Sequence, residues 1–206
     1  MNTETNRERN EIDTESPDNS NTLDIGYAHH QQIEEMIDIV RYCLETLSFE
    51  FDRWGEEHVK GPGFYLVIVS GTSVEEYADP MGRNRWPIET CQNIFGNSEE
   101  FYRAASTVSG TMDGAVVASI DGALLEQMVR VKDLSSQELR ARTGEGVGYE
   151  DWMGSRHMNA LDTSVRDDVV ATITLSEENG RVTTFINGEF TDYSRNEVGG
   201  RWRVQP

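Results

Sequence analysis

Three short apolar runs, each next to turn-forming residues, constrain the fold of this chain more than any other feature. Residues 64–69 read FYLVIV after a Gly-Pro-Gly turn, residues 114–120 read GAVVASI before an Asp-Gly turn, and residues 169–175 read VVATITL. Valine, isoleucine and aromatic residues in runs of this length are typical of buried strands. The runs therefore predict a central β-sheet.

A longer segment has the apolar spacing of a helix. Its apolar side chains recur three or four positions apart, at Ile33, Met36, Ile37, Val40, Leu44 and Leu47. This period predicts a helix from about Leu23 to Trp54 that covers the core with one face. Shorter helices are expected over residues 87–95 and 98–108, and near 155–165. Residues 72–86 are expected to form a loop, and residues 133–150 a polar loop or a short helix.

Dipeptides that favour tight turns connect the expected strands. Asp121-Gly122 predicts a hairpin from which residues 124–131 return antiparallel to the strand before it. Asn179-Gly180 predicts a two-residue hairpin turn with residues 181–186 pairing back, and Asn187-Gly188 leads to a short last strand. The expected fold is therefore a single α/β domain, in which a mixed central β-sheet has helices packed on its faces.

The length of 206 residues suits one domain with a substantial core. Residues 1–22 have almost no large apolar side chains and several acidic ones, so we expect a disordered acidic tail there. The domain is expected over residues 23–195, followed by a second tail over residues 196–206.

The charge is strongly negative. Thirty-seven acidic residues against 18 basic ones give a formal net charge of −19, and Lys60 and Lys132 are the only lysines. Such a surface fits a high-salt cytoplasm, where screening shortens the range of self-repulsion. The alternative is an acidic protein from ordinary salt conditions. In either case the charge argues against nucleic-acid binding, because affinity for a duplex comes largely from lysine and arginine on phosphates.

Other features of the whole sequence concern membranes, cellular location and disulfides. No apolar run approaches the roughly 20 residues that a membrane span needs, and the polar, acidic start of the chain is unlike a signal peptide. We therefore expect a cytoplasmic protein that does not bind membranes. Cys43 and Cys91 are too few for a disulfide framework, so free buried thiols are expected.

Two blocks of polar residues could carry phosphoryl chemistry. Asp113-Gly114-Ala115 puts a carboxylate just before an expected strand, where Gly114 allows a ligand close to the backbone. The alternative is an ordinary turn, since Asp-Gly is common turn chemistry and recurs at Asp121-Gly122-Ala123. The second block, Ser155-Arg156-His157, stands at the expected start of a helix, where backbone amides, a hydroxyl and a guanidinium can bind phosphates. Its alternative is a serine cap beside a surface arginine and a half-buried histidine.

Further carboxylates follow at the end of the strand 169–175. Glu177 and Glu178 come after Ser176 and open the Asn179-Gly180 turn. Glutamates at a hairpin are usually solvated. With Asp113 they also offer the oxygen ligands that Mg²⁺ or Mn²⁺ prefers when it bridges a substrate phosphate, and the sequence does not choose between these two metals.

The order of these blocks resembles a known family, the DisA-type diadenylate cyclase domain. The family's blocks read D-G-A, G-T-R-H-R and S-E-E-T-G, and this chain has D-G-A from Asp113, G-S-R-H-M from Gly154 and S-E-E-N-G from Ser176. The resemblance covers roughly residues 25–192, with the detailed match in the last two blocks. It implies condensation of two ATP molecules into cyclic di-AMP, with release of two pyrophosphates, across a face-to-face homodimer or within a higher homo-oligomer.

The resemblance also implies roles for single residues. Asp113 would bind metal together with Glu178 and would assist the attacking hydroxyl. Gly114 and Ala115 would let the nucleotide approach. Ser155, Arg156, His157 and Ser176 would contact the triphosphate, with Arg156 and His157 counted among the catalytic residues. Glu177 is the alternative acidic contact.

One departure from the family pattern bears on activity, because Met158 stands where the family has its second arginine. A charge-assisted phosphate contact is worth about 1.5–3 kcal/mol. Two alternatives to the cyclase therefore stay open: a catalytically silent nucleotide-binding module of the same fold, and an unrelated acidic interaction protein. In the last of these, Asp113, Arg156 and Glu178 would be scattered over the surface.

Overall fold

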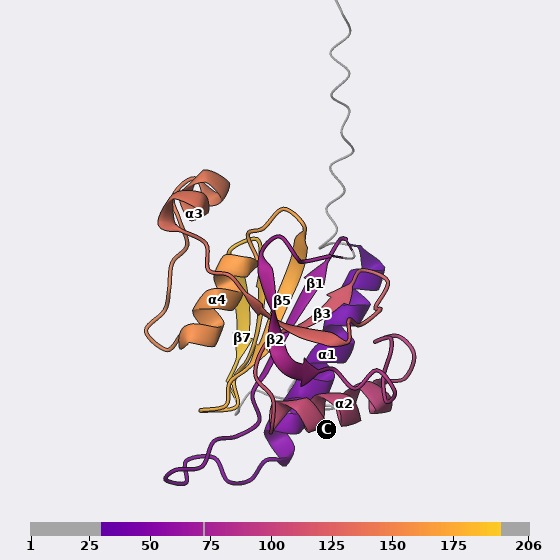
Figure 1. The fold of residues 1–206 in the computed structure, drawn as a ribbon. Helices are drawn as coiled ribbons and strands as arrows, with labels where there is room; N and C mark the ends of the chain where they lie inside the picture. Colours follow the sequence, from indigo (N-terminus) through magenta and orange to yellow (C-terminus); the bar gives the residue numbers. More distant parts are fainter. Residues whose placement is uncertain (1–29, 72, 195–206) are drawn as a thin grey trace, which may run out of the picture.

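A five-stranded mixed sheet forms the centre of the computed structural model, which describes residues 30–71 and 73–194 (Figure 1). The strand order is β3-β1-β5-β6-β7, with β1 parallel to β3 and antiparallel to β5. A separate two-stranded ribbon joins β2 to β4. The strands are β1 (Phe64–Val69), β2 (Ala78–Arg85), β3 (Val116–Ser119), β4 (Gln127–Val131), β5 (Val169–Leu175), β6 (Val182–Ile186) and β7 (Glu189–Tyr193). The mixed α/β architecture predicted from the sequence is confirmed, while both predicted tails lie outside the described residues.

Strand β1 explains why its run is apolar throughout. Its side chains alternate between two hydrophobic clusters, Phe64, Leu66 and Ile68 facing one and Tyr65, Val67 and Val69 the other. All six residues are buried. Complete burial of a large aliphatic side chain contributes about 1.5–3 kcal/mol, so this central strand anchors both layers of the core.

Helices cover the two faces of the sheet. Helices α1 (Gln31–Glu50) and α2 (Ser98–Ser109) contribute to the cluster on one face, with α1 burying Met36, Val40 and Leu44. Helix α4 (Ser155–Thr163) packs on the other face through Ala160 and Leu161. The buried Thr172 hydroxyl of β5 donates to the Ala160 carbonyl at 2.8 Å, which fixes α4 against the sheet. Helix α3 (Ser136–Thr143) is part of the segment that connects β4 to α4 (Figure 1).

The strand registers bring three distant segments to one edge of the sheet. Leu66 lies opposite Val116 in the parallel pair, and Phe64 lies opposite Leu175 in the antiparallel pair. If both registers are continued to the end of the strands, Gly63 stands between Asp113 and Ser176. The polar blocks that precede β3 and follow β5 therefore meet on either side of the start of β1.

Several predicted boundaries are wrong. Residues 78–85 form strand β2 and not a loop, because backbone bonds to β4 hold this mostly exposed segment. No helix forms over residues 87–95. The Trp86 indole donates to the Cys91 carbonyl at 2.7 Å and the Asn93 side chain accepts from the Phe95 amide, so local side-chain bonds replace helical ones. Among the described residues α1 ends at Glu50 and does not reach Trp54, whose indole donates to the Ser48 carbonyl.

The turns follow the prediction in part. Asn187 and Gly188 both have positive φ, at 50° and 79°, as a two-residue hairpin turn requires, and β7 follows. The predicted length of the Asn179-Gly180 turn, two residues, is wrong. The Ser176 amide bonds the Arg181 carbonyl and the Gly180 amide bonds the Ser176 carbonyl, so four residues form the loop. After Asp121-Gly122 the chain returns antiparallel to β3 only through isolated bridges, and β4 pairs chiefly with β2.

Two further predictions concern the chain as a whole. Cys43 and Cys91 are free and buried, as expected. Within residues 30–71 and 73–194, no helix has the length and apolar character needed to cross a bilayer.

Candidate functional site

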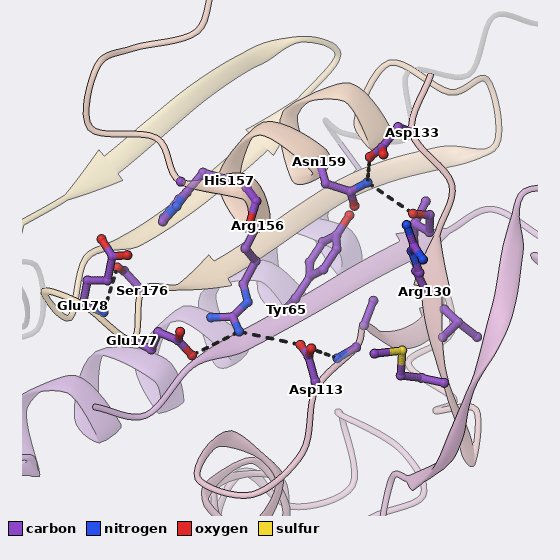
Figure 2. Close-up of a pocket in the computed structure, with 17 residues that line it drawn as sticks. Tyr65, Asp113, Arg130, Asp133, Arg156, His157, Asn159, Ser176, Glu177 and Glu178 are labelled. Carbon is purple, nitrogen blue, oxygen red and sulfur yellow. Dashed lines mark hydrogen bonds and ion pairs between the residues drawn. The ribbon is translucent and has the colours of Figure 1, made fainter. Parts of the chain in front are cut away.

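A cavity of about 580 Å³ opens at the sheet edge where the polar blocks meet (Figure 2). Its volume is within the range usual for small-molecule sites. The lining combines residues from both sides of the sheet edge, from β4 and from the start of α4. The lining residues are Tyr65, Met81, Asp113, Gly114, Ala115, Val129, Arg130, Val131, Asp133, Gly154, Ser155, Arg156, His157, Asn159, Ser176, Glu177 and Glu178. Every residue predicted as a nucleotide or metal contact is therefore in one cavity wall.

Arg156 lies between two carboxylates at the centre of this wall (Figure 2). Its Nη2 is 3.4 Å from Glu177 Oε2 and 3.9 Å from Asp113 Oδ1. A Cβ atom on Gly63, just before β1, would lie 2.5 Å from Arg156 Nη1, so a larger residue there would displace this guanidinium. The arginine side chain is 25% exposed, which leaves part of it open to a ligand.

Asp113 is more accessible than Glu177, with its side chain 74% exposed against 30%. Its Oδ1 accepts the Gly114 amide at 2.9 Å, and Gly114 has φ of 107°, a conformation that other residues rarely adopt. A Cβ atom at Gly114 would lie 3.0 Å from Met81 Cγ and 3.1 Å from the Val129 carbonyl oxygen. The glycine thus permits the tight approach of β2 and β4, and it turns the Asp113 carboxylate toward Arg156.

The start of α4 faces the same cavity. Gly154 is the N-cap and offers no side-chain bond to the first helical amides. Gly154 and Ser155 are both exposed. The first amides of α4 and the Ser155 hydroxyl are therefore available at the helix start, as in an anion site. Across the cavity, the buried Ser176 hydroxyl accepts the Glu178 amide at 3.3 Å, and this bond shapes the loop after β5.

Glu177 is held by two cations. Lys60 Nζ lies 2.6 Å from Glu177 Oε1. The hydrogen bond from Lys60, reinforced by the nearby Arg156 charge, lowers the pKa of the Glu177 carboxyl below its usual value. Glu177 is therefore ionised at neutral pH and occupies one side of the Arg156 guanidinium.

His157 faces an aromatic cluster as well as the cavity. It is 5% exposed, and its ring makes edge contacts with Trp152 at 5.1 Å and Phe185 at 6.4 Å. Its Nε2 is shielded from solvent and has no hydrogen-bond partner among the described residues. Burial, together with the charges of Arg156 and Arg181, lowers the pKa of His157 from 6.5 to about 4. The imidazole is neutral at pH 7, so the positive charge at this helix start comes from Arg156; the phosphate contact expected of His157 stays a prediction.

This burial of His157 gives a pH dependence of stability. A neutral buried histidine stabilises the fold above the pKa of the unfolded chain, near 6.5, and the contribution disappears as pH falls toward the folded value of about 4. We expect the parent to lose roughly 3 kcal/mol of unfolding free energy over that window relative to a His157→Gln variant. Urea unfolding of both proteins at pH 7, 5.5 and 4.5 measures the difference. If the unfolding free energies of the parent and of His157→Gln fall equally with pH, the acid sensitivity comes from groups other than His157.

The cavity wall carries more negative than positive charge. Four carboxylates, from Asp113, Asp133, Glu177 and Glu178, face two guanidiniums, from Arg130 and Arg156. Within the described residues no three His, Cys, Asp or Glu side chains lie close enough to hold a metal by themselves. Asp113 and Glu178 are exposed oxygen donors on this wall, which suits Mg²⁺ or Mn²⁺ completed by phosphate oxygens and water.

Sequence reasoning missed six polar or glycine positions of the site: Lys60, Gly63, Tyr65, Arg130, Asp133 and Asn159. Asn159 follows Arg156 by three residues, so helical spacing could have found it. Arg130 is the exposed residue between buried Val129 and Val131, and it forms no ion pair with a described residue. Met158 does not line the cavity; it packs against the core cluster beneath α4.

The comparisons with known proteins give fold-level likenesses. No family model matches the sequence, and no curated protein matches it. One similar solved structure is a double cysteine mutant of DacA from Staphylococcus aureus, with 17% identity, a TM-score of 0.48 and coverage of 85% of this chain and 100% of that chain. Another is a hypothetical membrane spanning protein from Bacillus cereus, with 16% identity, a TM-score of 0.48 and coverage of 78% of this chain and 64% of that chain.

Proposed function

We propose that this chain is a metal-dependent diadenylate cyclase that joins two ATP molecules into cyclic di-AMP. The observation that carries the proposal is the arrangement around Arg156, where an exposed carboxylate, a guanidinium and an uncapped helix start share one cavity. These groups come from the three sequence blocks that resemble the diadenylate cyclase domain. Their presence in one cavity wall argues against an interaction protein with Asp113, Arg156 and Glu178 scattered over its surface.

Each chemical step needs a nucleophile, a neutralised phosphate and a leaving group. The 3′-hydroxyl oxygen of one ATP attacks the α-phosphorus of the other, and the bond from that phosphorus to pyrophosphate breaks. Asp113, exposed at the cavity rim, accepts the hydroxyl proton. Arg156 and the amides at Ser155 neutralise the phosphate oxygens, so the protein contributes position and charge. Repeating the step with exchanged roles closes the ring and releases the second pyrophosphate.

A divalent cation fits this scheme because the cavity wall has an excess of carboxylates and ATP is itself an anion. Asp113 and Glu178 would hold the ion, which would supply positive charge to offset the negative charge of the reacting phosphate. Ser176 positions the loop that carries Glu178, through its bond to the Glu178 amide. Gly114 and Ala115 line the cavity, where they would let the nucleotide approach the backbone.

Two copies of the chain are part of the proposal. One cavity of about 580 Å³ would hold one ATP, and the second nucleotide has to come from another protomer facing it. The homodimer is thus a requirement of the chemistry, because one protomer alone provides no second α-phosphate to attack.

The test is product analysis. Purified protein is incubated with ATP and either Mg²⁺ or Mn²⁺, in high salt to screen the net charge of −19, and products are identified by chromatography and mass spectrometry. Cyclic di-AMP and two equivalents of pyrophosphate support the cyclase. ATP binding without product supports the silent nucleotide-binding module, and absence of both contradicts the nucleotide site.

Arg130 is expected to supply the second arginine that Met158 does not. It lines the same cavity from β4, and its guanidinium has no ion-pair partner among the described residues. We expect Arg130→Gln to reduce kcat/KM by about 10–100-fold, the effect of one lost charge-assisted bond. Steady-state kinetics measures this loss, and Arg83→Gln, on exposed β2, is the matched control. Equal kcat/KM values for Arg130→Gln and the parent would contradict a role for Arg130 in binding phosphate.

A further inference from the structure

Two carboxylates of the candidate site stand on a loop that the sheet does not hold directly. Glu177 and Glu178 belong to the turn between β5 and β6, and both line the cavity (Figure 2). Pairing between the two strands ends at Leu175 and Val182. A metal is bound well only when contacts behind its ligands keep the ligand atoms in place. What holds this loop from behind therefore bears on what the site can bind.

The C-terminal end of α1 provides one such contact. The buried Ser48 hydroxyl donates to the Gly180 carbonyl at 2.6 Å. The indole of Trp54, which comes shortly after α1, donates from Nε1 to the Ser48 carbonyl at 2.9 Å. A Cβ atom on Gly180 would lie 2.9 Å from Trp54 Cζ2, so the indole packs directly against the backbone of the loop. Phe51 makes an edge contact with the indole, with ring centres 4.9 Å apart.

The same indole packs against the segment before β1. A Cβ atom on Gly61 would lie 2.2 Å from Trp54 Cη2 and 2.3 Å from Cζ3. The Gly61 amide donates to the Glu177 carbonyl at 2.8 Å, and the neighbouring Lys60 pairs with the Glu177 carboxylate. One aromatic ring thus contacts both Gly61 and Gly180, and it fixes two segments that meet at Glu177.

We propose that Trp54 is a positioning residue of this site, which places Glu177 and Glu178 for a divalent cation. Trp54 does not line the cavity, so it acts through the loop that it contacts. The inference rests on the proposed function, because the cation is the one that accompanies the nucleotide. The α4 end of the site is fixed to the sheet separately, by the bond from Thr172. Loss of the indole therefore weakens binding of the metal-loaded nucleotide and spares binding of the nucleotide alone.

The first measurement uses 3′-deoxy-ATP, which lacks the attacking hydroxyl, with and without Mn²⁺ in high salt. In Trp54→Leu we expect isothermal titration to show about tenfold weaker binding of the Mn²⁺-loaded analogue, with less than about a twofold change for the metal-free one. Gly61→Ala displaces the same ring and should have the same effect. Trp54→Phe keeps a six-membered ring between the two segments, so it should bind within about threefold of the parent.

The second measurement does not depend on any ligand. We expect amide hydrogen exchange over residues 176–181 to quicken about tenfold in Trp54→Leu and in Gly61→Ala, because the loop loses its support. Val40→Ala removes a fully buried side chain from the middle of α1 and is the control for a general loss of stability. Gly148→Ala adds a methyl group in open space and is the control for a glycine replacement. Both controls should match the parent in these two measurements.

Three outcomes overturn the proposal. Exchange over residues 176–181 that is the same in Trp54→Leu and the parent means that the indole does not hold the loop. Equal losses of metal-loaded and metal-free binding, or the same effects in Val40→Ala, assign Trp54 to general stability. Absence of analogue binding in the parent contradicts the proposed function instead, and the exchange comparison then decides by itself whether Trp54 positions the loop.

Discussion

Replacing Asp113 by asparagine is expected to abolish cyclic di-AMP formation, with a fall in rate of about a thousandfold or more. Asparagine keeps the oxygen that accepts the Gly114 amide, so the turn before β3 is retained. It removes the negative charge that would accept the hydroxyl proton and bind the cation. Because the Asp113 side chain is 74% exposed, the free energy of unfolding should change by less than about 1 kcal/mol. Product analysis and thermal melting measure the two effects separately.

Asp121→Asn is the matched control for this prediction. Asp121 begins a second Asp-Gly-Ala sequence eight residues later, and its carboxylate accepts from the Ala123 amide in a turn outside the cavity. The same change in charge and in local sequence should therefore leave the rate unchanged. If Asp113→Asn retains more than a tenth of the parental rate, or if Asp121→Asn loses as much, the role of the Asp113 carboxylate in the proposed reaction is wrong.

The sequence predicted the elements whose pattern is unambiguous. The apolar runs over 64–69 and 169–175 became β1 and β5 at the same bounds, because each is covered on both faces. The polar segment 78–85 could not be recognised as a strand. Backbone pairing to β4 holds this segment in place. Because most of its side chains are exposed, they show no apolar alternation. The apparent helix over 87–95 failed because Trp86 and Asn93 bond the backbone locally.

The site was predicted in its parts and not in its geometry. Asp113, Arg156 and Glu178 were found from short blocks in the sequence, and they line one cavity. What brings them together is the register of β1 against β3 and β5, which no local pattern encodes. Gly63 and Lys60 were missed for the same reason, since their importance comes from contacts with Arg156 and Glu177 more than 90 residues away.

Replacing Arg156 by glutamine is expected to weaken ATP binding by about 10–100-fold and to reduce kcat/KM by about a thousandfold or more. The guanidinium is 3.4 Å from Glu177 and 3.9 Å from Asp113, so its loss removes the positive charge at the centre of an acidic wall. Stability should change by less than about 1 kcal/mol, because Glu177 keeps its ion pair with Lys60 at 2.6 Å. Isothermal titration with ATP and metal, together with initial rates, measures the two effects on function.

Two variants separate this effect from a general loss of charge. Arg142→Gln removes a similarly exposed arginine, paired with Asp167 outside the cavity, and should leave ATP binding unchanged. Glu177→Gln removes the carboxylate that competes with phosphate for Arg156, so it should tighten ATP binding by about threefold to tenfold. Weaker binding in Glu177→Gln would instead make Glu177 the cation ligand in place of Glu178. Unchanged binding in Arg156→Gln would contradict the assignment of this cavity to the triphosphate, because Arg156 is the guanidinium that lies beside both Asp113 and Glu177.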